Sequence, residues 1–418
     1  MPRIIYSLLL YLALPYVLLR LWWRSRRQPE YLQHIGERFG CYSTKPGAAP
    51  LIWLHAVSVG ETRAAEPLVR ALREKYPDHR ILLTHMTPTG REAGVALFGD
   101  DVIRHYLPYD YPGAVRRFLD HFRPRIGLLM ETEIWPNLVH ACKARGVSLH
   151  LVNARLSEKS FANYQRMPAL TAATLRDLTA IAAQTAADAQ RFTALGARPE
   201  SVSVFGNLKF DVEPPAALIA EGARLRASLG TRAVLLAAST RDGEEILFIN
   251  NNIYSDPDVP NLLLILVPRH PQRFDDVALL LQQQGVRYQR RSENAAIRAD
   301  TQVLLGDSMG ELFAYYAACD AAFIGGSLLP FGGQNLIEAC ALGKPVLVGP
   351  HTYNFADAAE SAIAAGAALR VMDVTDLARK ASALLTHPAL MQRMGEAALQ
   401  FSKTHRGAAQ KLLETLRF

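Results

Sequence analysis

The feature that most constrains the fold is a glycine-rich stretch at 322–350, AFIGGSLLPFGGQNLIEACALGKPVLVGP. Its pattern predicts a buried strand at 322–324, a loop with two glycine pairs, a helix at 335–342 and a second buried strand at 346–348. Glycine tolerates positive φ and lets a ligand approach the backbone closely. The stretch therefore predicts a parallel α/β sheet in which this loop contacts a ligand beyond the carboxyl ends of the strands.

The start of the predicted helix would present free N–H groups and a positive dipole end to the loop, which favours an anion. Glu338 lies about one turn into that helix, where its carboxylate can also accept hydrogen bonds from the vicinal hydroxyls of a ribose. The alternative is that the glycines form an ordinary loop and that Glu338 only stabilises its helix terminus. The stretch lacks G-x-G-x-x-G, so it does not predict a dinucleotide-binding fold.

The run GGQNLIEACALGKPVLVGP resembles the nucleotide-sugar site in the C-terminal domain of the GT-B glycosyltransferases. It is similar in particular to the Kdo transferases, which attach 3-deoxy-D-manno-octulosonic acid (Kdo) to lipid A precursor. The resemblance implies an α/β fold of the GT-B type, in which two Rossmann-like domains face a cleft. It also implies that the donor CMP-Kdo is contacted by Asn335, Leu336, Ile337 and Glu338.

Length and composition agree with a two-domain protein. A chain of 418 residues is long for one hydrophobic core, and 50% hydrophobic with 20% charged residues excludes a disordered chain. The net charge of +7 favours anionic partners, such as nucleic acid, phospholipid or phosphorylated sugar, without choosing among them. The four cysteines are scattered and form no C-x-x-C pair, which favours reduced thiols in the cytoplasm over a zinc site or a disulfide framework.

The chain begins with a nearly uncharged apolar run at 4–23, followed at once by Arg24, Arg26 and Arg27. A membrane-spanning helix needs about 20 apolar residues. No small-residue cleavage site follows, and the positive charges come after the apolar run, so the pattern favours an uncleaved anchor over a signal peptide. Because basic flanks stay in the cytoplasm, the body of the protein should lie there, with the arginines at anionic headgroups. A helix lying in the plane of the interface is the alternative, since Pro15 interrupts the run.

Apolar strands alternate with amphipathic helices along the rest of the chain, which predicts βαβ units and parallel sheets. The clearest strands are at 51–56, 81–84, 126–130, 147–152 and 201–205, and then at 233–238, 262–267 and 303–305. We therefore expect a membrane anchor at 1–35, an acceptor domain at 36–206, a linker at 207–231, a donor domain at 232–387 and closing helices at 388–418, which could pack back across the cleft.

Ser58-Val59-Gly60-Glu61 follows the first predicted strand. The spacing fits a capping box, in which serine and glutamate satisfy N–H groups at a helix start. It also fits a general base that removes a proton from a sugar hydroxyl. Resemblance to the S-V-G-E motif of the Kdo transferases favours Glu61 as that base, and such a base needs some burial to keep its basicity.

Two further motifs carry charged candidates. In Met130-Glu131-Thr132-Glu133-Ile134-Trp135-Pro136-Asn137, two carboxylates on an extended segment would share a face. They can also be ordinary acids before a helix that Pro136 opens, and we expect Trp135 to pack rather than bind ligand. Lys209 in GNLKFD would on its own be a solvated linker residue. The resemblance implies that Glu131 and Lys209 stabilise the transition state.

The family motifs also imply donor contacts from Pro268 and Arg269, and from Met309, Gly310 and Glu311. His270 is more typical of a structural turn residue, and Ser308 to Glu311 fits another capping box. Asp256-Pro257-Asp258 has the D-x-D spacing of some metal sites but lies in a tract rich in Asn, Pro and Asp, which favours a solvated turn. We expect no metal and no other cofactor.

The resemblance extends over essentially the whole chain and implies transfer of Kdo, with inversion, to the 6'-hydroxyl of the lipid A precursor. The implied partners are CMP-Kdo, lipid A precursor and the anionic inner-membrane surface of a Gram-negative bacterium on its cytoplasmic side, and no nucleic acid. The alternatives are a UDP-sugar epimerase, another lipid glycosyltransferase, or a membrane-tethered nucleotide-binding protein without turnover.

Overall fold

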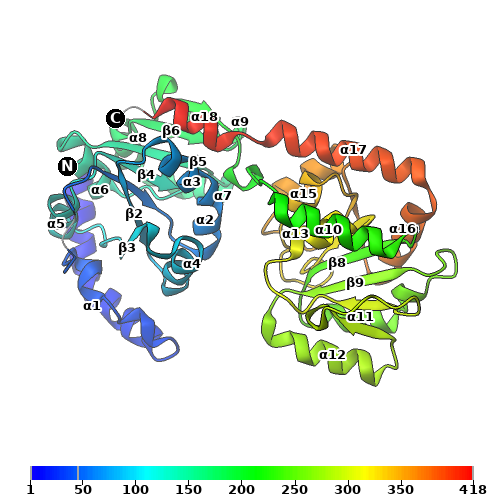
Figure 1. Cartoon of the computed structure of the whole chain (residues 1–418). Helices are drawn as coiled ribbons and strands as arrows, with labels where there is room; N and C mark the ends of the chain where they lie inside the picture. The colour runs from blue at the N-terminus through cyan, green and yellow to red at the C-terminus, as the bar shows by residue number, and fades with distance from the viewer. Residues whose placement is uncertain (1, 45–46, 417–418) are drawn as a thin grey trace. The chain divides into compact units, whose positions relative to one another are not determined.

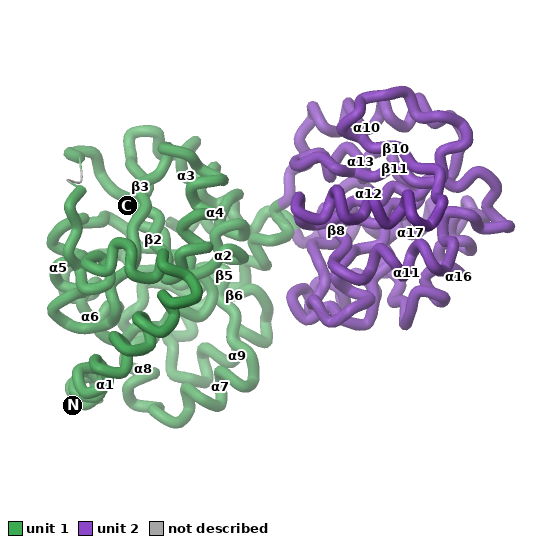
Figure 2. The backbone as a smooth tube through the Cα atoms, turned by 90° about the horizontal axis from the view of Figure 1, so that it is seen from below, with its two compact units in different colours: residues 1–211, 406–418 green, residues 212–405 purple. Residues whose placement is uncertain are grey.

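The computed structural model of the protein describes residues 2–44 and 47–416. The chain divides into two compact units, Met1–Asp211 with Arg406–Phe418 and Val212–His405 (Figure 2). In the described part of the chain each unit contains one seven-stranded parallel sheet, with helices packed on it (Figure 1). The predicted pair of α/β domains is confirmed. Their predicted boundaries, and the cleft that they should share, stay predictions.

The sheet of unit 1 has the strand order β3-β2-β1-β4-β5-β6-β7. Its central strands are buried because both faces are covered, as expected for near-continuous apolar runs. The strands are β1 (Leu51–His55), β2 (Arg80–His85), β3 (Ile103–Tyr106), β4 (Ile126–Met130), β5 (Ser148–Ala154), β6 (Ala180–Ala183) and β7 (Val202–Val204). The helices are α1 (Pro2–Ser25), α2 (Val59–Ala64), α3 (Glu66–Lys75), α4 (Pro88–Phe98), α5 (Pro112–Phe122), α6 (Pro136–Ala144), α7 (Glu158–Tyr164), α8 (Pro168–Asp177), α9 (Ala186–Ala194) and α18 (Ala408–Thr415).

The sheet of unit 2 has the order β10-β11-β9-β8-β12-β13-β14. Its strands are β8 (Val234–Thr240), β9 (Leu263–Pro268), β10 (Tyr288–Arg290), β11 (Val303–Leu305), β12 (Ala321–Ile324), β13 (Val346–Val348) and β14 (Ala368–Arg370). Its helices are α10 (Ala216–Leu229), α11 (Glu244–Asn250), α12 (Phe274–Gln283), α13 (Leu312–Ala318), α14 (Ile337–Ala341), α15 (Ala356–Ala364), α16 (Val374–Thr386) and α17 (Pro388–His405).

The C-terminal segment contributes to both units. α17 belongs to unit 2, whereas α18 belongs to unit 1, where Leu412 and Leu413 are buried in the core cluster beneath β1 and β2. The carboxylate of Asp211 accepts hydrogen bonds from the first backbone N–H groups of α18, those of Gly407, Ala408 and Ala409. Asp211, the last residue of the first segment of unit 1, therefore fixes α18 to the same unit.

The N-terminal apolar run forms a single helix of 24 residues, α1, which continues through Pro15. Among the described residues it is the one helix long and apolar enough to cross a membrane. Helix length and composition thus agree with the predicted membrane segment.

Candidate functional site

Glu61 lies in the first turn of α2, just beyond the carboxyl end of β1. Its carboxylate accepts hydrogen bonds from the Val57 N–H at 2.8 Å and the Ser58 hydroxyl at 3.1 Å. Ser58 in turn is the N-cap of α2 and accepts from the Glu61 N–H at 3.5 Å. The capping interpretation of this motif is confirmed. It is compatible with a role as base, because the carboxylate oxygens have further lone pairs that can accept a proton.

Burial is the main cause that raises the pKa of Glu61, to about 7. The nearby carboxylates of Glu131 and Glu133 add to the rise, since they disfavour a further negative charge, while the N–H of Val57 opposes it. A carboxylate with a pKa near 7 is well matched to accept a proton at physiological pH. The burial that the sequence argument required for this residue is present.

Glu131 directly follows β4 and has a left-handed backbone, with φ of 56°. Its N–H donates to the Val152 carbonyl on the neighbouring strand at 3.0 Å. A non-glycine residue in this region is strained by about 1–3 kcal/mol, and such strain is concentrated at functional sites. The expectation that Glu131 and Glu133 share a face of an extended segment is wrong, because the chain turns at Glu131.

Both carboxylates nevertheless lie near Glu61, as their effect on its pKa shows. Glu133 accepts a hydrogen bond from the Trp135 indole at 2.6 Å, and Trp135 packs against the core around β1 and β4. The prediction that Trp135 is a packing residue is confirmed.

Lys209 belongs to unit 1 and lies next to Glu131, with 4.0 Å between its Nζ and the carboxylate. Its backbone is held firmly, because the preceding Leu208 N–H donates to the Asn153 side chain at 2.9 Å. Asn207 caps this short turn by accepting from the Lys209 N–H at 3.0 Å. Lys209 is therefore not a solvated linker lysine, and the structure brings it together with Glu131 in unit 1.

In unit 2 the glycine-rich loop leaves the carboxyl end of β12. A Cβ on Gly325 would lie 2.4 Å from the Ser239 carbonyl oxygen, so only glycine fits beside the end of β8. Gly326 and Gly333 have φ of 70° and 75°, and the Gly333 N–H donates to the Gly326 carbonyl at 2.7 Å. The loop is closed on itself, as the two glycine pairs predicted.

The fully buried Glu244, in the first turn of α11, holds this loop. Its carboxylate accepts hydrogen bonds from the N–H groups of Gly326 at 2.6 Å and Leu328 at 3.0 Å. Sequence reasoning missed Glu244. The available signal was the pair of acids at 244–245, after the β8 strand, which is ordinary for a helix start and gives no indication of a distant loop.

α14 begins at Ile337, two residues later than predicted, and contains only five residues. Asn335 precedes it, accepts from the Ile337 N–H at 3.1 Å and donates to the Glu338 carboxylate at 3.1 Å. The expected extent of this helix, 335–342, is thus wrong. Because the observed helix is short, its dipole gives less support to an anion site. Leu336 and Ile337 are buried, so only their backbone atoms are suited to touch a ligand.

Basic side chains gather where β8 and β9 end. Pro268 is the last residue of β9, and the Arg269 N–H donates to the Thr240 carbonyl at 2.9 Å. Burial lowers the pKa of His270, and the positive charges of Arg241 and Arg269 lower it further. Three cationic or basic groups therefore share this strand edge and suit an anionic ligand.

Arg241 links this basic group to the loop and was also missed from the sequence. Its guanidinium lies 4.8 Å from the centre of the Phe331 ring, and its Cγ would lie 3.2 Å from a Cβ on Gly326. A single arginine after a strand carries no sequence signal of its own. Its proximity to the loop follows only from the pairing of β8 with β12.

Met309, Gly310 and Glu311 lie between β11 and α13. Ser308 donates its hydroxyl to the Glu311 carboxylate, and Arg291 also donates to that carboxylate at 3.2 Å. α13 has no side-chain cap, so the capping-box alternative is wrong here: the serine hydroxyl bonds the carboxylate instead of the helix N–H groups. Gly310 has φ of 86° and Met309 is exposed.

The D-x-D segment forms a turn, in which the Asp256 carboxylate accepts from the Asp258 N–H at 2.8 Å. The prediction of a turn is confirmed. Residues 2–44 and 47–416 contain no group of three or more His, Cys, Asp or Glu side chains able to hold a metal ion.

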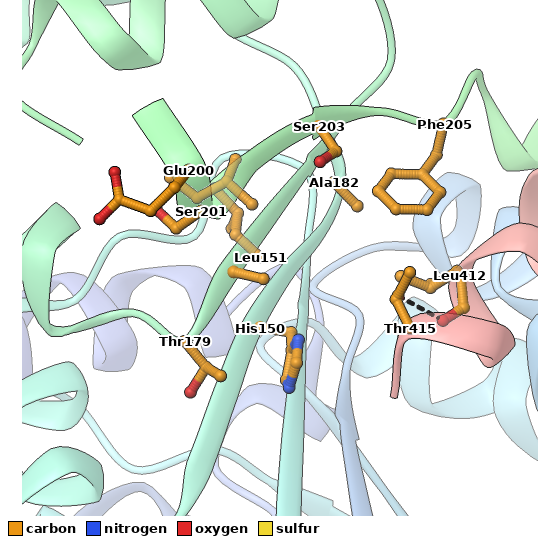
Figure 3. A pocket seen from close by; sticks show the side chains of 12 residues that line it. His150, Leu151, Thr179, Ala182, Glu200, Ser201, Ser203, Phe205, Leu412 and Thr415 are labelled. Atoms are coloured by element: carbon orange, nitrogen blue, oxygen red, sulfur yellow. Dashed lines mark hydrogen bonds between the residues drawn. The ribbon is translucent and has the colours of Figure 1, made fainter. Parts of the chain in front are cut away.

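A cavity of about 210 Å³ lies in unit 1 beneath β5, β6 and β7, next to α18 (Figure 3). Its lining includes His150, Thr179, Ser203 and Leu412 and none of the predicted site residues. Burial lowers the pKa of His150 to about 4, so this imidazole is neutral at physiological pH.

Comparison with known proteins agrees with this arrangement. Residues 33–212 match the family described as 3-deoxy-D-manno-octulosonic-acid transferase (kdotransferase), and residues 259–401 match the glycosyl transferases group 1. A 3-deoxy-D-manno-octulosonic acid transferase of Bordetella pertussis is 45% identical over 429 residues, covering 100% of this chain and 99% of that protein. The corresponding protein of Haemophilus influenzae is 39% identical over 420 residues, covering 100% and 98%.

The fold is similar to that of a UDP-GlcNAc 2-epimerase from Neisseria meningitidis bound to UDP-GlcNAc, with a TM-score of 0.56 over 87% of this chain and 99% of that one. At 15% identity this likeness shows the GT-B-like fold alone. The full-length sequence relatives carry the assignment further, and the chain belongs to the Kdo transferase family of glycosyltransferases.

Proposed function

We propose that the protein transfers Kdo from CMP-Kdo to the 6'-hydroxyl of lipid IVA, the tetraacylated, bisphosphorylated precursor of lipid A, in synthesis of the lipopolysaccharide inner core. The observation that carries the proposal is Glu61. This half-buried carboxylate just beyond the end of β1 has a pKa of about 7, beside Glu131 and Glu133. The full-length family relatives support the same reaction.

In this reaction Glu61 takes the proton of the acceptor hydroxyl. The oxygen forms a bond to the anomeric carbon of Kdo, and the bond from that carbon to the phosphate oxygen breaks, with its electron pair leaving on CMP. Attack opposite to the leaving group inverts the configuration at the anomeric carbon. A carboxylate with a pKa near 7 holds the proton without releasing it to bulk water at once.

Lys209 and Glu131 stabilise the charges that develop during transfer. The ammonium group of Lys209 offsets negative charge on the departing phosphate or on the sugar carboxylate, while Glu131 offsets positive charge at the anomeric centre. Their separation of 4.0 Å and the strained backbone at Glu131 support a pair positioned for function.

Unit 2 binds the donor. The basic residues after β8 and β9 suit the single phosphate and the carboxylate of CMP-Kdo, and Pro268 and Arg269 contact the nucleotide. The Asn335 to Glu338 segment and the exposed Met309-Gly310-Glu311 turn complete the contacts to CMP. The exposed apolar α1 supports a place on the cytoplasmic face of the inner membrane, where a lipid acceptor stays within lateral reach.

The test uses the full chain in lipid vesicles with CMP-Kdo and lipid IVA, followed by CMP release and by the mass of the product. We expect release that depends on the acceptor and a product heavier by Kdo. Acceptor-independent release, or none, would contradict the proposal and favour another nucleotide-sugar enzyme of this fold.

Glu61→Ala tests the base in the same assay. We expect transfer to fall at least a hundredfold while CMP still binds, because the donor site is in unit 2 and a positioned base contributes about 10²–10⁴-fold. Glu66→Ala is the matched control, since Glu66 pairs with Arg70 on the surface of the next helix. Unchanged transfer by Glu61→Ala would refute the assigned base.

A further inference from the structure

α1 shows a helical pattern of burial along its whole length. The partly buried residues recur every three or four positions, and near the end of the helix Leu21 is only 5% exposed. These residues are Arg3, Tyr6, Ser7, Leu10, Ala13, Leu14, Val17 and Leu21. A helix surrounded by lipid would show no such one-sided burial, whereas a helix lying along a folded surface does.

Polar contacts fasten this inner face to unit 1. The Ser7 hydroxyl donates to the Asn137 side chain at 3.1 Å, at the start of α6. The Tyr111 hydroxyl donates to the Leu10 carbonyl at 3.2 Å, and the Tyr11 ring lies 5.1 Å from that of Tyr111. The first half of α1 is thus attached to the α/β body, whereas its second half packs on the short helix Pro29–Tyr31 that follows it.

The opposite face of α1 is an apolar stripe, with the exposed Arg20 at its edge. Leu12, near its middle, is 77% exposed. The stripe consists of Ile4, Ile5, Leu8, Leu9, Leu12, Tyr16, Leu19 and Trp23, flanked by Tyr11, Leu18 and Trp22. The helix is about 36 Å long. An exposed apolar stripe of this length on a soluble surface marks an interaction site.

The charges at the end of α1 fit an anionic lipid surface. Arg24, Arg26 and Arg27 follow the stripe, and the helix contains no acidic residue. The guanidinium of Arg26 lies 4.1 Å from the Trp22 ring, and that of Arg27 lies 5.4 Å from the Trp23 ring. Aromatic rings paired with arginines are typical of the level of the headgroups.

We infer that α1 does not cross the bilayer but lies in the plane of one leaflet, with the stripe around Leu8, Leu12 and Leu19 in the acyl region. Spanning would either break the contacts of Ser7 and Leu10 or carry polar groups of unit 1, such as Asp110 before α5 and Asn137 at the start of α6, into hydrocarbon. Each such polar group costs several kcal/mol when it is left unpaired there. The unit 1 surface is thereby held flat against the anionic lipid.

This inference deepens the proposed function, which supplies the lipid acceptor, but its tests contain no sugar nucleotide and no acceptor. The first test decides between crossing and lying flat. In a Cys41→Ser background, Pro2→Cys and Gln33→Cys are labelled with a membrane-impermeant maleimide on inverted membrane vesicles. Lying flat predicts equal labelling at both ends of α1. Labelling of Gln33→Cys alone would overturn the inference, because it places the start of α1 across the membrane.

The second test identifies the binding face. The full chain is sedimented with vesicles of phosphatidylcholine and phosphatidylglycerol, and we expect Leu8→Glu with Leu12→Glu to weaken binding at least tenfold without lowering Tm, since both side chains are exposed. Leu279→Glu on α12, also exposed, is the matched control and should bind unchanged.

Unchanged vesicle binding by the double variant would overturn the inference. The inference would also be overturned if light scattering showed a dimer for the wild type and a monomer for the double variant, because the stripe would then contact a second copy of the chain. Loss of transferase activity with normal vesicle binding contradicts only the proposed function, so the two failures are distinguishable.

Discussion

Glu61 shows how one residue serves both the local structure and the chemistry. Its hydrogen bonds to Val57 and Ser58 complete a helix cap, and these bonds favour the ionised form. Burial and two neighbouring carboxylates oppose them and raise the pKa of Glu61 to about 7. The balance keeps the carboxylate ordered by the cap and basic enough to take a proton.

This balance predicts the pH dependence of transfer. The base has to be ionised, so kcat/KM should fall tenfold per pH unit below about pH 7, where Glu61 becomes protonated. Glu133→Gln removes one negative charge that raises this pKa, and the acid limb should therefore move to lower pH. A glutamine oxygen still accepts from Trp135, which preserves the packing. pH profiles of the two proteins measure the shift. A shift to higher pH, or none, would contradict the assignment.

At the scale of elements, the donor loop depends on close contact between strands. β8 pairs with β12, and Gly325 at the end of β12 lies against the Ser239 carbonyl. Ser239 itself has a left-handed backbone, with φ of 58°. Glu244 then fixes the loop through its N–H groups. Two strand ends and one helix start thus determine the shape of the loop together.

Gly325→Ala should distort this arrangement. Its Cβ would lie 2.4 Å from the backbone oxygen of Ser239, so the loop has to move, at a cost of about 1–3 kcal/mol in the free energy of unfolding. We expect a lower Tm and at least tenfold weaker CMP binding by calorimetry. The control is Gly113→Ala on α5, where the added Cβ meets only the Arg117 guanidinium at 3.6 Å. Normal CMP binding by Gly325→Ala would show that the loop is not the donor site.

At the scale of the whole molecule, the chain returns to unit 1 after completing unit 2. Asp211 caps the start of α18, and the buried side chains of Leu412 and Leu413 pack this helix against α3 and the sheet. The charge of Asp211 also lies at the positive end of the α18 dipole, which is favourable. Unit 1 is therefore complete only when the last helix is present.

Asp211→Ala should loosen α18, because several N–H groups at its start lose their acceptor. We expect a loss of about 1–2 kcal/mol in the free energy of unfolding of unit 1, with faster hydrogen exchange in α18. Asp373→Ala removes a comparable cap from α16 in unit 2, where Asp373 accepts from the Asp376 N–H at 2.8 Å. That control should leave exchange in α18 unchanged. Equal protection of α18 in both variants would contradict the role of Asp211.

The sequence by itself determined the elements whose cause is local. Apolar runs gave the strands, the serine of S-V-G-E gave the cap of α2, and the glycine pairs gave a loop that is closed by positive φ. The motifs also placed Glu61, Arg269 and the glycine loop at carboxyl ends of strands. Each of these follows from the residue and its near neighbours in the chain.

Only the tertiary structure decided what depends on contacts between distant residues. It turned the backbone at Glu131, shortened the helix after Asn335, and brought Glu244 to the glycine loop and Asp211 to α18. It also raised the pKa of Glu61 and exposed one face of α1 while the other packs on unit 1. Burial and long-range hydrogen bonds are properties of the packed chain, so no local pattern encodes them.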